Sequence, residues 1–201
     1  MDILGRLPII LLEQDELKKF PRPLDKTDKQ LDPIGSEGSG SFTWLESNIS
    51  YIPGLNCLID LLMVWQKAQS CIGTQTVEMS LEKLQFVMDN FPPKLRWRGG
   101  LSRPSNVTYG HDVQIANLFV TSLHIRSNLV QRFGTHEVKS REYPKIIDDL
   151  LEVLFHLPQA VFDANGKSLA PKIRDMGPHI LNGWESQAAK DMVEAIVPRI
   201  S

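Results

Sequence analysis

The segment VFDANGKSLAPKIRDM contains Gly-Lys-Ser at positions 166–168, which is how a phosphate-binding P-loop ends. A P-loop reads G-x-x-x-x-G-K-[ST], because its glycines let backbone N–H groups close around the phosphates. The first glycine of that pattern would fall at position 161, which is Val161. The residues before it are apolar at helical spacing, whereas a P-loop follows a buried strand. We therefore interpret Asn165-Gly166 as the end of one helix and Ser168 as the cap of the next.

Metal-binding spacing is absent from the sequence. No pair of histidines has the i, i+4 spacing of a helical zinc site with a glutamate between them. The two cysteines, Cys57 and Cys71, lack C-x-x-C spacing and fall in helical patterns, so we expect buried free thiols. The sequence predicts neither a metal site nor a cofactor. The five histidines are His111, His124, His136, His156 and His179.

Catalytic groupings are equally absent. The only Gly-Ser-Gly, at 38–40, lies in linker composition with no strand before it, so it is not a nucleophile elbow. The pairs Asp15-Glu16 and Asp148-Asp149 are adjacent in sequence, and neighbours on a helix point about 100° apart. We expect such a pair to form a solvated face rather than an acid/base pair. The sequence therefore predicts that the chain is not an enzyme.

One basic cluster could contact nucleic acid, because bases interleaved with an aromatic side chain can bind phosphate and stack. The chain nevertheless has a formal net charge of -2. We interpret the cluster as surface charge, with Trp97 packed against helices, and expect no direct DNA binding. The start of the chain has too short an apolar run for a membrane span. The cluster comprises Lys94, Arg96, Arg98 and Arg103 around Trp97.

The elements that would position these residues are helices. Residues 1–45 are interrupted by prolines and by GSEGSGS, which predicts a loop-rich segment, and 46–201 are predicted to form one helical domain. The fold class is all-α, an irregular multi-helix bundle of about six helices. The apolar spacing predicts helices at 52–73, 80–91, 111–134, 143–157, 168–182 and 186–198.

The helix boundaries carry further expectations. The first helix is apolar almost all round, which predicts a central, buried position. Ser80 and Asp112 are the predicted caps of the second and third helices, and Gly134 ends the third. Gly177-Pro178 predicts a kink or break. A helix end at Gly166 with positive φ would make Gly166→Ala destabilising by about 1 kcal/mol. The apolar face of the second helix is predicted to comprise Leu81, Leu84, Phe86, Val87 and Met88.

Two segments together resemble a known family. HDVQIANLFVTSLHIRSNLVQ, followed by IIDDLLEVLFHLPQAVFDANGKSLAPKIRDM, resembles the regulatory "middle homology" domain of fungal binuclear zinc-cluster transcription factors. The start GRLPIILLEQDELKKFPRPLD and the stretch FTWLESNISYIPGLNCLIDLLMVW resemble earlier parts of the same domain. The matching positions are Ala116, Asn117, Leu118, Val120, Thr121, Leu123 and Arg126, then Leu157, Pro158, Ala164, Asn165, Gly166, Ser168, Leu169, Lys172, Ile173 and Arg174.

The resemblance implies a non-catalytic, nuclear transcription regulator. Its partners would be proteins of the transcription machinery or a full-length relative, with a small-molecule effector as a further partner. Members of the family read DNA through a six-cysteine zinc cluster, and this chain has two cysteines. We expect a regulatory domain without its own DNA reader, truncated at its start. The alternative is a helical interaction module that sequesters or modulates a full-length relative.

The cysteine count gives a first testable prediction. Purified chain should carry no stoichiometric zinc by elemental analysis after dialysis against a metal-free buffer, because two separated cysteines cannot build a six-cysteine cluster. Zinc at the binuclear level of that family would contradict this interpretation.

Overall fold

All regular structure in the described part of the chain is helical, as the sequence predicts. The computed structural model describes residues 21–27, 49–70, 76–99 and 107–183. Residues 21–27 form no helix. The boundary predicted at 45–46 and the helix predicted at 186–198 lie outside these residues. The described elements are α3 (Ile52–Ser70), α4 (Val77–Asp89), the 3₁₀ helix η4 (Pro93–Leu95), α5 (Tyr109–Phe133), α6 (His136–His156) and α7 (Gln159–Gly183).

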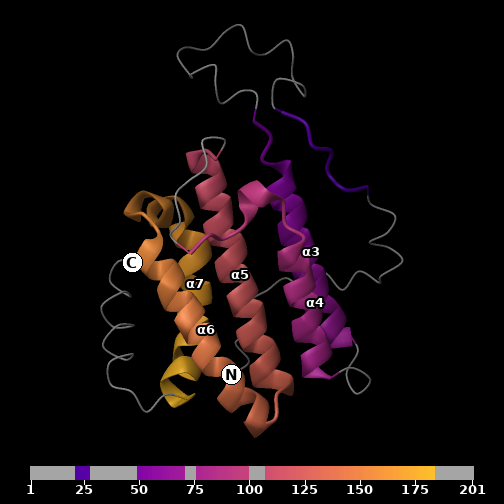
Figure 1. Ribbon diagram of the computed structural model, residues 1–201, viewed down its shortest axis with the longest axis vertical. Helices are drawn as coiled ribbons and strands as arrows, with labels where there is room; N and C mark the ends of the chain where they lie inside the picture. The colour runs from indigo at the N-terminus through magenta and orange to yellow at the C-terminus, as the bar shows by residue number, and fades with distance from the viewer. Residues whose placement is uncertain (1–20, 28–48, 71–75, 100–106, 184–201) are drawn as a thin grey trace, which may run out of the picture.

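Helix α5 runs through the centre of the bundle, with α3 and α4 on one side and α6 and α7 on the other (Figure 1). Its apolar residues lie on two opposite faces. Leu118 and Leu129 belong to the apolar cluster shared with α3 and α4, whereas Val120 and Leu123 belong to the cluster shared with α6 and α7. At about 100° per residue these two sets point in opposite directions. The third helix is therefore the central one, not the first as predicted.

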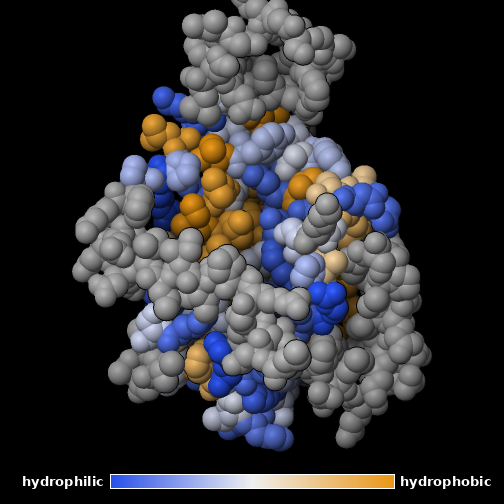
Figure 2. Space-filling view, turned by 180° about the vertical axis from the view of Figure 1, so that it is seen from behind, coloured by the Kyte–Doolittle hydropathy of each residue, from blue (hydrophilic) through white to orange (hydrophobic). Residues whose placement is uncertain are grey.

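Helix α3 lies at the edge, and one of its faces is exposed. Leu55 and Leu62 are 43% and 44% exposed, and apolar surface is visible over the upper part of α3 from behind (Figure 2). Asp60 on the same helix pairs with Arg22, and Pro23 accepts a hydrogen bond from Asn56, so residues 21–27 contact α3. A helix whose sequence is almost wholly apolar can therefore keep one face exposed.

Two helices begin upstream of their predicted caps. The Thr76 hydroxyl accepts the Met79 N–H at 3.3 Å, so Thr76, not Ser80, caps α4. Thr108, not Asp112, precedes α5: its backbone N–H donates to His111 Nδ1 at 3.2 Å. In both places a threonine lies one turn before the predicted residue, and threonine is a favoured cap.

The predicted apolar face of α4 is wrong at one position. Phe86 is 68% exposed, whereas Leu84 is buried. Two residues along a helix are about 200° apart, so a helix that buries Leu84 turns Phe86 toward solvent.

Helix α6 begins seven residues before its predicted start. Thr135 caps it by accepting the Val138 N–H, and Pro144 then lies inside the helix rather than at its beginning. The added residues 136–142 include few apolar ones, which is why apolar spacing missed this first part of the helix.

Helix α7 is one continuous element, which corrects the predictions of a helix end, of a cap and of a break inside it. It includes Asn165-Gly166, where the sequence predicts a helix end, and Ser168, predicted as a cap. It also continues past Gly177-Pro178, so the chain does not break there, and the kink that the sequence offers as the alternative stays a prediction. At the first of these places tertiary packing outweighs the local signals, because a buried stripe continues across Asn165-Gly166. It comprises Val161, Phe162, Asn165, Leu169, Ile173 and Met176.

Gly166 gives the second prediction, with the opposite sign from the sequence-based one. A Cβ at Gly166 would meet no atom within 4 Å, and the residue lies in mid-helix. Gly166→Ala should therefore raise the free energy of unfolding in urea by about 0.5–1 kcal/mol.

The matched control is Gly134→Ala, at the end of α5. A Cβ there would lie 2.4 Å from the Val130 carbonyl oxygen, so this variant should lower stability. Destabilisation by Gly166→Ala would show that α7 is interrupted at this point in solution.

Candidate functional site

A groove opens among α4, α5 and α6, with a cavity of about 430 Å³. This volume is within the range of small-ligand sites, roughly 300–1,000 Å³. Charged residues also line it: Glu82 from α4, Arg126 from α5, and Glu142 and Asp149 from α6. The groove therefore combines an apolar wall with a charged one. Its apolar residues are Leu81, Leu84 and Met88 from α4 with Phe119 and Leu123 from α5.

Arg126 joins α5 to α6 at the charged wall. One guanidinium nitrogen donates to Asp149 Oδ2 at 2.9 Å and the other to Glu142 Oε2 at 2.8 Å. The planar fork of arginine suits two such acceptors at once. Glu142 Oε1 also accepts from Arg141 at 3.1 Å and from Lys145 at 3.3 Å.

The two carboxylates of this network differ in their pKa. Burial alone would raise the pKa of Glu142, but hydrogen bonds from Arg126, Arg141 and Lys145, with the Arg126 charge, lower it to about 2. Burial raises the pKa of Asp149, Arg126 only partly offsets this effect, and the nearby charges of Glu152 and Asp148 raise the pKa slightly further. Glu142 is thus the firmly ionised member, and Asp149 is the carboxylate that a further cation would stabilise.

A second polar network joins α5 to α7. Lys172 Nζ donates to Asn117 Oδ1 at 2.8 Å, to Thr121 Oγ1 at 2.7 Å and to Ser168 Oγ at 3.3 Å. The Ser168 hydroxyl also donates to Asn117 Oδ1 at 3.2 Å. Asn165 Nδ2 donates across the same interface to the Val113 carbonyl at 3.0 Å. We call the five side chains Asn117, Thr121, Asn165, Ser168 and Lys172 the α5–α7 seam.

The seam holds a lysine among neutral oxygens. Burial lowers the pKa of Lys172 to about 8, and one turn away burial also lowers the pKa of His124, whose Nε2 lies 3.8 Å from Asp175. A lowered lysine pKa is one mark of a reactive amine. Here, however, three oxygen acceptors already take the Nζ hydrogen bonds, so the geometry is that of a structural clamp.

The other described histidines and Cys57 lie outside the seam. His111 caps α5, and His156 lies with its ring centroid 6.5 Å from that of Trp97. In the part of the chain that the structure describes, no group of His, Cys, Asp and Glu could hold a metal ion. Cys57 is a buried free thiol, as predicted, and burial raises its pKa to about 11. Cys71 and the His179 side chain lie outside the description.

Trp97 packs against helices, as the sequence predicts. Its ring centroid lies 5.5 Å from that of Phe119, and its indole N–H donates to Glu152 Oε1 at 3.0 Å. Two cations of the basic cluster turn to backbone carbonyls: Arg96 donates to Phe91 at 2.7 Å and Arg98 to Pro93 at 3.1 Å. Arg103 lies outside the described residues.

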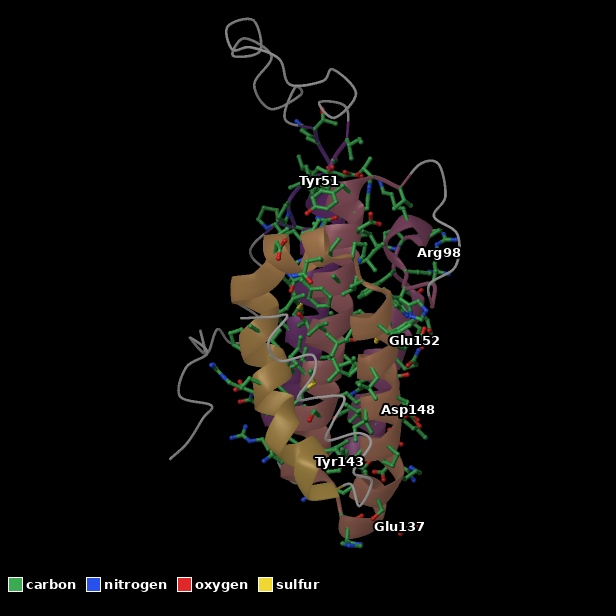
Figure 3. All side chains as sticks on the ribbon, turned by 90° about the vertical axis from the view of Figure 1, so that its left-hand side faces the viewer. Tyr51, Arg98, Glu137, Tyr143, Asp148 and Glu152 are labelled. Carbon is green, nitrogen blue, oxygen red and sulfur yellow. The ribbon has the colours of Figure 1, made fainter. Side chains whose placement is uncertain are left out.

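The adjacent acids Asp148 and Asp149 point apart, as a helix requires. Asp149 faces Arg126 and lines the groove, so it does not belong to a purely solvated face as expected. Asp148 is exposed and lies with Glu152 along one edge of α6 (Figure 3). Sequence reasoning missed the groove, although Glu142 and Asp149, seven residues apart, share one face of a helix.

Comparisons of the chain with protein-family models, with curated proteins and with solved structures find no match. The resemblance to fungal zinc-cluster regulators stays a prediction from the residues themselves. Among the described helices, none has both the length and the apolar character needed to cross a bilayer.

The Arg126 network gives the third prediction, a dependence of stability on pH. Folding lowers the pKa of Glu142 below its value in the unfolded chain. The contribution of Glu142 to the free energy of unfolding is therefore complete above that unfolded-state pKa and is lost as pH falls from about 5 to 2. Glu142→Gln should lower the free energy of unfolding near pH 7 by about 1–3 kcal/mol, and the cost should shrink toward pH 2.

Urea unfolding at several pH values measures this difference. Asp148→Asn, which removes an exposed carboxylate from the same helix, is the matched control and should have little effect. An equal loss for Glu142→Gln at pH 7 and pH 2 would show that the charge of Glu142 is not what stabilises the fold.

Proposed function

We propose that the chain is a non-catalytic helical module that regulates transcription, of the kind that the regulatory domain of fungal zinc-cluster factors represents. In this proposal it acts in the nucleus, through protein partners, and its helical domain makes no direct contact with DNA. A DNA-binding partner, or a full-length relative, would supply the contact to the gene.

The observation that supports the proposal is the α5–α7 seam. The two motifs that carry the resemblance are about fifty residues apart in sequence, yet their polar residues hydrogen-bond to one another. Lys172 and Ser168 of the second motif contact Asn117 of the first, and Lys172 also contacts Thr121. A chance match in two unrelated helices would not be expected to place these polar positions in one interface.

The described site chemistry agrees with a binding role rather than catalysis. Three charged residues of the groove, Arg126, Glu142 and Asp149, are paired across helices, and the Lys172 amine is held by three acceptors. Where a hydroxyl does meet a histidine ring, Thr108 Oγ1 with His111 Nδ1 at 2.8 Å, the contact belongs to the capping box at the start of α5.

A second candidate, sequestration of a full-length relative, is favoured by the exposed face of α3. Leu55 and Leu62 lie one above the other, seven residues apart, and each is more than 40% exposed. Exposed apolar surface of this kind marks protein–protein contacts in many proteins. The two candidate functions predict different behaviour. A regulatory module changes transcription when it is tethered to DNA, whereas a sequestering module acts only by binding a separate transcription factor.

The fourth prediction tests the proposed function directly. When the chain is fused to a heterologous DNA-binding domain above a reporter gene, transcription should change severalfold relative to the DNA-binding domain alone. Lys172→Met should weaken that effect, because it removes the ammonium that holds α7 against α5. Lys83→Met, which removes an exposed lysine from α4, is the matched control.

The same chain without the DNA-binding domain tests sequestration. Lowered activity of a co-expressed zinc-cluster factor, with no effect of the tethered fusion, would favour the second candidate. No effect in either arrangement, at confirmed nuclear expression, would contradict both.

A further inference from the structure

The α4–α5–α6 groove has two chemically distinct walls. Leu84, Met88 and Phe119 provide apolar surface, with Leu81 and Leu123 beside them. Such a wall takes up the apolar part of a ligand, because burying apolar surface is favourable wherever it is removed from water. The cavity, about 430 Å³, is large enough for a small molecule.

The charged wall is acidic on balance. Three carboxylates, Glu82, Glu142 and Asp149, line the groove together with one cation, Arg126. Arg141 and Lys145 also pair with Glu142, but they do not line the cavity. Because Arg141 and Lys145 help to neutralise Glu142, Glu82 and Asp149 are the carboxylates available to a cationic ligand.

Two further acids lie on the surface beyond Asp149. Asp148 and Glu152 lie along the adjoining edge of α6, and both act on Asp149 as like charges (Figure 3). Asp149 itself is 40% exposed at its side chain although it pairs with Arg126. A cation entering the groove would relieve this like-charge repulsion, whereas an anion would add to it.

We propose that this groove binds a small molecule that combines an apolar body with one cationic group, such as an alkyl- or arylalkyl-ammonium. The apolar body lies along Leu84, Met88 and Phe119. The cationic group lies between Glu82 of α4 and Asp149 of α6, where it bridges two helices that flank α5. Phe119 adds an aromatic side chain to the apolar wall, on which a cation can also rest.

The inference gives an effector class to the proposed function, but its test uses purified chain and no transcription. The two can therefore fail separately: a ligand can bind a chain that does not regulate transcription, and a regulator can leave this groove empty.

The experiment uses three probes with one apolar body and different heads: 4-phenylbutylamine, 4-phenylbutanol and 4-phenylbutyrate. Binding to the full chain is followed by NMR of isotope-labelled methionine methyl groups. Met88 lines the groove, whereas Met79 lies exposed on the same helix and outside it. The Met88 signal should shift and saturate with the amine, and the Met79 signal should not.

The amine should bind at least about fivefold more tightly than the carboxylate, and the alcohol should have an intermediate affinity. Added salt should reduce the difference in affinity between the amine and the carboxylate. Glu82→Gln should weaken binding of the amine by about two- to fivefold. Glu78→Gln is the matched control, because it removes an exposed carboxylate from the same helix outside the groove.

Any one of four results would overturn the proposal. The carboxylate could bind as tightly as the amine, or Glu78→Gln could weaken binding as much as Glu82→Gln. The Met88 signal could also shift with chain concentration alone, which would make the groove a contact between copies of the chain. Absence of a saturable Met88 shift at millimolar amine would equally contradict it.

Discussion

The arrangement of the described bundle depends on one constraint: α5 is buried on two opposite faces, and several of its polar residues take their partners from neighbouring segments. A buried polar group without a hydrogen bond costs roughly 1–3 kcal/mol. Arg126 finds its partners on α6, and Asn117 and Thr121 find theirs on α7. Gln114 donates to the Tyr51 carbonyl, just before α3, at 2.6 Å. Helices α6 and α7 and the start of α3 are thus held against α5 by apolar packing and also by a specific polar contact.

Apolar packing and polar pairing do different work in this bundle. Side chains such as Leu61, Leu129, Val153 and Leu169 are at most 2% exposed, and burial of each contributes about 1.5–3 kcal/mol. The net contribution of one hydrogen bond is smaller, about 1 kcal/mol. Apolar burial therefore supplies most of the stability. The two networks set the register, because a helix shifted by one residue would keep some apolar contact but leave Arg126 or Lys172 without its acceptors.

Much of this fold could be predicted from apolar spacing, and the errors have common physical causes. The all-α class and the positions of α3, α4 and α5 follow from periodicity, but caps such as Thr76 and Thr108 lie outside the apolar pattern that locates a helix. The prediction at Gly166 is wrong because local stop signals compete with packing, and the stripe that includes Leu169 outweighs them.

The groove could not be predicted, because it depends on how three helices pack. Single-sequence spacing can place Glu142 and Asp149 on one face of a helix, but it cannot bring Arg126 of another helix to meet them. The α5–α7 seam could be predicted only in part. Its residues match a family pattern in the sequence, while their contact with one another is visible only in three dimensions.

The most direct test of the central claim is a double-mutant cycle across the seam, with Thr121→Val and Lys172→Met. Thr121 and Lys172 meet at 2.7 Å, and each variant keeps a side chain of similar shape. If the seam fixes α7 on α5, urea unfolding should give an interaction energy of at least about 0.5 kcal/mol, as residues in one network do. Additivity of the two single changes to within about 0.3 kcal/mol would contradict the claim, because it would mean that the contact between Thr121 and Lys172 does not couple α7 to α5.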